Sequence, residues 1–290
     1  MFKVALKRLC WGVLNCLPDA VAVRIFYFRT FRRFPNLSKP STFNEKITWR
    51  KLHQPNERFK IFADRIAVKP EIARIMGDGY VIKTLWIGDS PDDIPFNQLT
   101  APYVIKTNHG NGGHIFIRTS ADINKAAIAA SLQKQLAYSH AHRWREWGYR
   151  NIPRKILVEE MILDTDGEVP TEYKFFVYHG RVQYILVIYS RFTDVQRAIL
   201  DRNWQRVPVS HLHPCNWNIT PQPARLAEMI SAAETIGSEF DFARVDLYAT
   251  AGWVKFGEVT FYPAAGLGRF EPAEWDAKFG EPWRLPPKFI

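Results

Sequence analysis

The chain has 290 residues with a formal net charge of +10, and 47% of the residues are hydrophobic. This apolar content suits one large domain or two modest ones and excludes a wholly disordered chain. Three cysteines without a Cys-x-x-Cys spacing argue against a disulfide framework or a structural zinc site, and they indicate a reducing compartment. The excess of basic residues favours anionic partners, namely nucleic acid, membrane lipid or acidic polysaccharide.

Residues 1–37 form a basic arm. The first 34 residues carry seven lysines and arginines against a single acid, Asp19. Apolar residues recur at helical spacing before Pro18, so we expect an amphipathic helix there and a second one after the proline. The uncharged run of residues 9–18 is too short to span a bilayer. The arm either packs on the body of the protein or lies on the anionic inner face of the cytoplasmic membrane.

Beyond the arm, helices alternate with strands. Thr42 and Glu45 have the spacing of a capping box, so a helix begins there. Apolar periodicity predicts further helices at residues 59–76, 121–138 and 223–240. Apolar runs predict strands at residues 80–88, 103–108 and 154–163, and hairpins at residues 172–191 and 243–261. The alternation of helices with hairpins predicts an α+β architecture.

The hairpin at residues 243–261 carries two carboxylates. Asp246 and Glu258 lie on opposite arms of a turn near residue 251, which places their side chains opposite each other on one face. Two carboxylates so placed suit Mg²⁺ when the ion also bridges nucleotide phosphates. The alternative is an ordinary pattern of polar outer and apolar inner residues, with Asp246 in solvent.

The segment after Val104 has the composition of a phosphate-binding loop. Lys106 ends an apolar strand, and Gly110, Gly112 and Gly113 follow it. A lysine ammonium at a strand end neutralises phosphate charge, and glycines let backbone N–H groups approach phosphate oxygens. The side chains of residues 108–109 could supply further donors. Because the lysine precedes the glycines, the segment is not a Walker A loop.

Five stretches of the sequence resemble one known family. They are KPSTFNEKITW, KTNHGNGG, EYKFF, RVDLY and FGEVTFYPAAG. The last, a glutamate strand followed by a polar residue and a Pro-x-x-Gly turn, resembles the metal-binding hairpin of ATP-grasp enzymes. Together the five are similar to the teichuronopeptide-biosynthesis (TupA-like) ATP-grasp family over about residues 38–280. The resemblance implies an α+β ATP-grasp fold, with nucleotide held between two α+β subdomains, preceded by a helical N-terminal segment.

The resemblance also implies a division of the chain into four parts. The basic helical arm covers residues 1–37, and an N-terminal α/β segment covers residues 38–100. The glycine-loop subdomain and hinge would occupy residues 101–163. The metal-binding subdomain and tail would occupy residues 164–290.

The same resemblance implies the residues of the site. The expected catalytic residues hold phosphates or face the transferred phosphoryl group, and they are Lys106, Lys174 and Arg244. The expected ATP-binding residues are Lys106, Gly110, Gly112, Gly113, Glu159, Glu160, Met161, Ile162 and Lys174. The expected Mg²⁺ ligands are Asp246, Glu258 and Thr260, where Thr260 stands in place of the asparagine that is usual in the superfamily. Residues suggested by position for substrate binding are Arg143, Arg145, Trp147 and Arg191.

The activity implied by the resemblance is that of an ATP-dependent carboxylate–amine ligase, which forms an amide through an acylphosphate. The family's setting implies that an amino acid or peptide amine donor is joined to a cell-envelope or capsular polysaccharide, or to its precursor. The acceptor would be an acidic or lipid-linked saccharide, and nucleic acid is not expected as a partner. We expect a cytoplasmic protein, with the arm as a contact to the inner membrane surface.

Three other patterns keep alternatives open. Asp164 and Asp166 match the Asp-x-Asp of metal-dependent glycosyltransferases, although Asp-Gly between strands is first of all a turn. His140 and His142 form a His-x-His pair that could bind metal. The arginines and aromatic residues of 140–151 suit nucleic acid or an acidic sugar chain, and they suit equally an exposed loop tucked onto the core.

Overall fold

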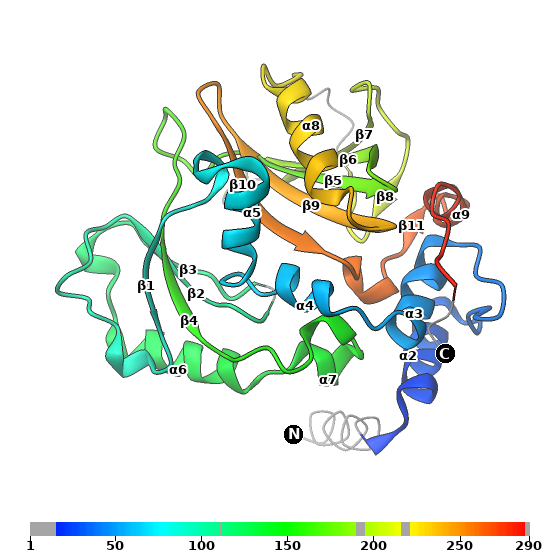
Figure 1. Ribbon diagram of the computed structural model, residues 1–290, viewed down its shortest axis with the longest axis horizontal. Coiled ribbons are helices and arrows are strands. Elements are labelled where there is room, and N and C mark those ends of the chain that lie inside the picture. The colour runs from blue at the N-terminus through cyan, green and yellow to red at the C-terminus, as the bar shows by residue number, and fades with distance from the viewer. Residues whose placement is uncertain (1–15, 111, 190–194, 216–220, 288–290) are drawn as a thin grey trace.

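The computed structural model describes residues 16–110, 112–189, 195–215 and 221–287. Two antiparallel sheets form its centre, and helices cover their outer faces (Figure 1). The helices of the described residues are α2 (Asp19–Phe31), α3 (Phe43–His53), α4 (Glu57–Ala63), α5 (Val68–Met76), α6 (Lys125–Ala137), α7 (His140–Trp144), α8 (Leu226–Gly237) and α9 (Trp275–Gly280). This mixture is the α+β architecture that the sequence predicted.

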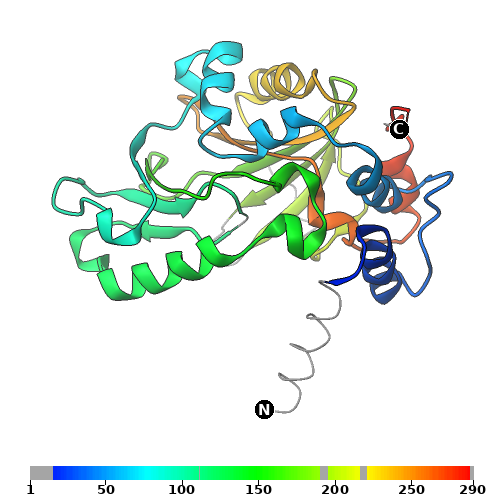
Figure 2. The same cartoon turned by 60° about the horizontal axis from the view of Figure 1, so that its bottom comes forward.

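The first sheet has four strands in the order β1-β4-β2-β3. Their bounds are β1 (Thr84–Gly88), β2 (Tyr103–Thr107), β3 (Ile115–Ile117) and β4 (Ile156–Glu160). Ile105 and Val158 face α6, whose buried residues Ile128 and Leu132 complete this smaller core. Figure 2 shows α6 running along this sheet.

The second sheet has five strands in the order β10-β9-β5-β6-β7. Their bounds are β5 (Glu172–Tyr178), β6 (Arg181–Tyr189), β7 (Gln196–Asp201), β9 (Phe242–Ala249) and β10 (Val254–Thr260), and a two-stranded sheet pairs β8 (Ser210–His211) with β11 (Phe270–Glu271). Every residue of the central strand β5 is buried, because α8 packs on the sheet with Met229, Ala232 and Ile236. In Figures 1 and 2, α8 lies on the side of the molecule away from α6.

The described part of the basic arm packs on the body of the protein. Helix α2 buries Ala22, Val23, Phe26 and Tyr27, and Arg33 after it forms an ion pair of 2.7 Å with Glu45 at the start of α3. Residues 1–15, where the first amphipathic helix was predicted, lie outside the described residues. None of the helices in the described ranges has the length and apolar character needed to cross a membrane.

Several predicted boundaries are confirmed by the structure. The backbone N–H of Glu45 donates to Thr42 Oγ1 at 3.3 Å, and the N–H of Thr42 donates to the Glu45 carboxylate at 3.4 Å, which completes the capping box. Strands β5 and β6 form the hairpin around residues 179–180, and β9 and β10 form the C-terminal hairpin.

The helix predicted for residues 59–76 is instead two helices, α4 and α5. The chain turns at Asp64, whose carboxylate accepts hydrogen bonds from the backbone N–H of Ile66 at 2.8 Å and from the Asn108 amide at 2.9 Å. Aspartate side chains that bond nearby backbone groups compete with helical hydrogen bonds, which ends α4 here. The prediction of one helix was therefore wrong, and the turn directs Arg65 toward β2.

Three other predicted elements are shorter than expected. Strand β1 begins only at Thr84, because a 3-10 turn occupies residues 78–80. Helix α6 begins at Lys125, where the Asn124 side chain caps the helix by accepting from the N–H of Ala127 at 3.0 Å. Helix α8 begins at Leu226 rather than at Pro223.

Candidate active site

The two carboxylates of the C-terminal hairpin lie opposite each other, as predicted. Glu258 on β10 pairs in register with Asp246 on β9, and Thr260 pairs with Arg244. Arg244 Nη2 lies 2.7 Å from Asp246 Oδ2, 3.2 Å from Glu258 Oε1 and 3.1 Å from Thr260 Oγ1. The alternative of a solvated Asp246 is wrong, because this side chain is fully buried. A buried carboxylate requires a charge partner, and Arg244 is one.

Lys174 joins this cluster from the neighbouring strand β5. It pairs in register with Asp246. Its ammonium contacts the Asp246 carboxylate and lies 2.8 Å from Glu172. Burial alone would raise the pKa of Glu258, but Arg65, Lys174 and Arg244 outweigh it and hold that pKa well below its usual range. Glu258 is therefore a carboxylate at neutral pH, which is the state that could bind a cation.

Arg65, which the sequence analysis missed, connects the two sheets. It is 7% exposed and projects from the turn between α4 and α5. Its guanidinium donates to the carbonyl oxygen of Thr107 in the first sheet at 2.8 Å and lies 3.5 Å from Glu258 in the second. Nothing in the local sequence marks this arginine, because its position depends on the helix break and on the meeting of both sheets.

A second charged cluster lies on the first sheet. Glu159 on β4 is 4% exposed, and its carboxylate contacts the ammonium of Lys106 on β2 and lies 2.6 Å from that of Lys69 on α5. Burial would raise the pKa of Glu159, but Lys106 and Lys69 hold it below its usual value. Lys106 thus points from the strand end into the space between the sheets. Lys69 is a further residue that the sequence analysis missed.

Two adjoining cavities between the sheets form what we call the intersheet cleft. The first, about 50 Å³, is lined by Lys106 and by residues 159–162, together with apolar residues such as Phe116. The second, about 80 Å³, is lined by Lys106, Gly112, Lys174 and Glu258, among others. The two cavities share the residues Ile82, Lys106, His114 and Tyr248. The cleft therefore brings together the strand lysine, the expected hinge, the second lysine and the hairpin glutamate.

Two of the missed cleft residues follow from simple alternation. Tyr248 stands two residues after Asp246 on β9, and Glu172 stands two residues before Lys174 on β5. Side chains at this spacing face the same side of a strand. Each could therefore have been predicted once its neighbour was assigned to the site.

The three glycines after β2 line a cavity next to the cleft. Gly110, Gly112 and Gly113 line a cavity of about 390 Å³, which we call the glycine-loop cavity, and Gly112 also lines the cleft. Gly112 and Gly113 have φ angles of +71° and +70°, a conformation that side chains disfavour. Residue 111, which precedes Gly112, lies outside the described residues.

The polar side chains just before these glycines contact other groups of the protein. The Asn108 amide donates to Asp64 and to the carbonyl oxygen of Pro153, each at 2.9 Å. The ring nitrogens of His109 lie 3.3 Å from the Asn108 side chain and 3.3 Å from the Tyr138 carbonyl oxygen. These contacts hold the segment against the body of the protein, and donation by the two side chains to a phosphate stays a prediction.

The residues suggested for substrate binding are scattered. Arg145 is 5% exposed, lies 3.4 Å from Asp19 and lines a separate cavity beside the glycine loop. Arg143 lies over the Trp144 ring at 5.7 Å, and the Trp147 ring holds the Lys60 ammonium at 4.3 Å. Although the structure describes Arg143 and Trp147, they are not among the residues that line that cavity or the cleft. Arg191 lies outside the described residues.

The Asp-x-Asp pattern forms a turn in the structure. Asp164 accepts hydrogen bonds from the backbone N–H groups of Asp166 at 3.0 Å and Glu168 at 2.9 Å, and the Asp166 side chain is exposed. An aspartate that bonds the backbone two residues on is the usual aspartate turn. The local geometry therefore favours the turn over a nucleotide-sugar site.

The hairpin offers oxygen ligands of the kind that Mg²⁺ prefers, namely two carboxylates and the Thr260 hydroxyl. Both oxygens of Asp246 already accept hydrogen bonds from Arg244, at 2.7 Å each. Within the described residues, no group of three or more His, Cys, Asp or Glu side chains is placed to hold a metal ion. Glu258 lines the cleft, so it could hold an ion that takes most of its ligands from bound phosphates, as Mg²⁺ commonly does, rather than an all-protein site.

Comparison with known families now identifies the fold. The model of the TupA-like ATP-grasp family matches residues 45–284. The chain belongs to this family. The match begins at Glu45, within α3, so α2 and the rest of the basic arm precede it. Membership establishes the ATP-grasp fold that the sequence motifs predicted.

Solved structures of other proteins are similar to this chain at low identity. The D-alanine–D-alanine ligase from Bacillus anthracis with ATP is 15% identical, with a TM-score of 0.41 over 76% of this chain and 58% of the ligase. A RimK domain ATP-grasp protein from Sphaerobacter thermophilus is also 15% identical, with a TM-score of 0.44 over 78% of this chain and 69% of that one. The chain thus spans less than two thirds of the D-alanine–D-alanine ligase. A search of curated proteins gave no match.

Proposed function

We propose that the protein is an ATP-dependent carboxylate–amine ligase, which forms an amide bond through an acylphosphate. One observation carries the proposal: Lys106, residues 159–162, Lys174 and Glu258 line adjoining cavities of one cleft. These residues come from four strands of two sheets, and each group was predicted from a separate motif. Their convergence supports a single site that binds a nucleotide along its length.

In this proposal, different residues of the cleft bind different parts of the nucleotide. The apolar cavity beside residues 160–162 receives the adenine, and Lys106 and Lys174 hold phosphate oxygens. Arg65 and Arg244 face the transferred group, where negative charge develops. When bound by Glu258, Asp246 and Thr260, Mg²⁺ neutralises phosphate charge. The protein otherwise contributes positioning and exclusion of water.

Nucleotide binding would require the cleft to widen. Its two cavities hold only about 50 and 80 Å³, and its lysines are paired with Glu159 and Asp246. Phosphate oxygens would compete with these carboxylates for Lys106 and Lys174. We propose that the glycine segment that borders the cleft moves outward and then closes as a lid over the phosphates.

The substrates follow from the family's setting and from charge. We propose that the amine of an amino acid or peptide is joined to an acidic or lipid-linked saccharide of the cell envelope or capsule, as in teichuronopeptide synthesis. The exposed side chains of Val21, Phe28 and Phe34, among the exposed arginines of the arm, support peripheral contact with the inner membrane surface. The protein would then act on the cytoplasmic side.

Thermal unfolding with ATP, a panel of UDP-sugars and RNA, each with and without Mg²⁺, tests this function. A ligand at 100 times its Kd raises the free energy of unfolding by about 2.7 kcal/mol. For a chain of this size, the melting temperature then rises by roughly 5–10 °C. We expect stabilisation by Mg-ATP that is lost in Lys106→Ala and Glu258→Gln and retained in Arg74→Gln, an exposed control. Stabilisation by a UDP-sugar but not by ATP would reject the ligase and favour the glycosyltransferase.

A further inference from the structure

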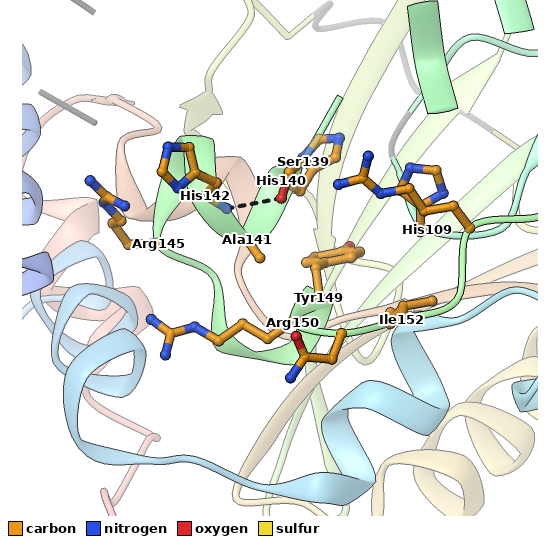
Figure 3. A pocket seen from close by; sticks show the side chains of 11 residues that line it. His109, Ser139, His140, Ala141, His142, Arg145, Tyr149, Arg150 and Ile152 are labelled. Carbon is orange, nitrogen blue, oxygen red and sulfur yellow. Dashed lines mark hydrogen bonds between the residues drawn. The ribbon is translucent and has the colours of Figure 1, made fainter. Parts of the chain in front are cut away.

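A cavity of about 330 Å³ beside the glycine loop has a strongly basic lining. We call it the arginine cavity. Its lining includes three arginines and three histidines, namely Arg145, Arg150, Arg154, His109, His140 and His142. Of the described residues that line it, none is acidic. In Figure 3, His140 and Tyr149 lie between His142 and Arg145 at one end and His109 at the other. A concave site with charge of one sign attracts ions of the other.

The positive charge of the cavity's arginines is only partly neutralised by a nearby carboxylate. Asp19 on α2 is the acid paired with the cavity's arginines in the described structure, and its one carboxylate contacts both Arg145 and Arg150. Arg154 donates to the carbonyl oxygen of Leu136 at 2.6 Å, a partner that carries no formal charge. Among the described residues, three arginines and one carboxylate leave an excess of positive charge at the cavity. Such an excess in a concave, partly buried lining favours a bound anion.

The glycine-loop cavity lies between the arginine cavity and the intersheet cleft and shares lining residues with each. His109 and His140 line both the arginine cavity and the glycine-loop cavity, and Gly112 lines both the glycine-loop cavity and the cleft. A Cβ at Gly110 would lie 3.4 Å from the His140 ring. Burial, with the nearby charge of Arg65, lowers the pKa of His140 to about 4. His140 is therefore a neutral side chain between the arginine cavity and the glycine-loop cavity, and the arginines carry the permanent charge.

We propose that the arginine cavity binds a second anionic group of the same substrate whose carboxylate reacts in the cleft. The substrate is then a polyanion, with one acid group in the cleft and another oxyanion, a carboxylate or a phosphate, on the arginines. The planar guanidinium of arginine binds both kinds of oxyanion through two parallel hydrogen bonds. The reaction assigned to the substrate rests on the proposed function, whereas anion binding in the cavity does not.

Calorimetric titration of the full chain tests the proposal. The probes are an N-acetylated tetraglutamate, which carries only carboxylates, and glycerol 3-phosphate, which carries one phosphate. We expect Arg154→Gln to weaken binding of at least one probe by about tenfold, because one charge-assisted hydrogen bond is lost. Arg154→Glu, which reverses the charge, should abolish that binding. Arg74→Gln on α5, which removes the same charge from a side chain that is 66% exposed, should leave it within about twofold.

Each outcome has one meaning. Binding of tetraglutamate alone assigns the second group as a carboxylate, and binding of glycerol 3-phosphate alone assigns it as a phosphate. The proposal is wrong if neither probe binds, if Arg154→Gln and Arg154→Glu bind like the wild type, or if Arg74→Gln weakens binding equally. Mg-ATP is titrated into the same preparation to separate this proposal from the proposed function. If the protein binds Mg-ATP but neither probe, only anion binding in the arginine cavity is rejected.

Discussion

Replacing Arg65 by glutamine gives the most direct test of how the two sheets form one site. The guanidinium donates to the Thr107 carbonyl oxygen at 2.8 Å and lies 3.5 Å from the Glu258 carboxylate. Glutamine is too short to keep both contacts and carries no charge. The variant should therefore loosen the junction between the sheets and raise the pKa of Glu258 toward its usual range, because Arg65 is the strongest of the charges that lower it.

The size of the effect follows from these contacts. A buried carbonyl oxygen that loses its partner costs about 1–3 kcal/mol. The ion pair adds about 1 kcal/mol at most, because its geometry is long and Glu258 keeps Arg244 as a partner. A total of roughly 1–4 kcal/mol lowers the melting temperature by roughly 2–15 °C. Nucleotide affinity should fall by about tenfold or more if Arg65 faces the transferred phosphate.

Thermal unfolding with and without Mg-ATP measures both effects. Arg74→Gln is the matched control, because it removes the same charge from an exposed ion pair that contributes about 1 kcal/mol at most. An Arg65→Gln variant with the melting temperature of the control, and with undiminished stabilisation by Mg-ATP, would refute the argument that Arg65 joins the sheets at the nucleotide site.

Three further predictions concern pH and local geometry. The pKa of Glu159 is held below its usual value in the folded state, so its contribution to stability is present above the unfolded pKa of about 4.3 and is lost as pH falls through the lower, folded value. Denaturant unfolding should accordingly show the gap between wild type and Glu159→Gln narrowing below about pH 4, and a constant gap would contradict this. Gly113→Ala should lower the free energy of unfolding by about 1–2 kcal/mol, because φ is +70° at this position. Gly79→Ala is the control: there is open space around the added Cβ, so the same assay should show almost no change. Asp164→Ala should lower the free energy of unfolding by about 1 kcal/mol, because the turn loses its side-chain hydrogen bonds, and should leave stabilisation by Mg-ATP unchanged. Loss of nucleotide binding in this variant would argue against the turn assignment.

Local patterns predicted much of the fold. The capping box at Thr42, the two hairpins and the strand that carries Lys106 all depend on neighbours within a few residues or across one turn. The facing of Asp246 and Glu258 could be predicted because the position of a hairpin turn sets which residues pair. The break at Asp64 was missed, because a single aspartate within an apolar helical pattern is also compatible with a continuous helix.

The charge partners of the site could not be predicted in the same way. Lys174 and Asp246 are 72 residues apart in the chain, and the local sequence around either residue does not predict their contact. The basic segment of residues 140–151 was recognised as a unit, but its role was not resolved. The structure separates it, since Arg145 and Arg150 line the arginine cavity and pair with Asp19, whereas Trp147 contacts Lys60.

The sequence by itself determined the family, the order of the motifs and the strands on which Lys106, Lys174, Asp246 and Glu258 lie. These properties follow from spacing along the chain, which sets the face of a strand and the partner across a hairpin. Only the tertiary structure decided that the motifs share one cleft and that Arg65 joins its walls. Arg65 contacts residues 42 and 193 positions away, and contacts at such separations arise only when both sheets pack together.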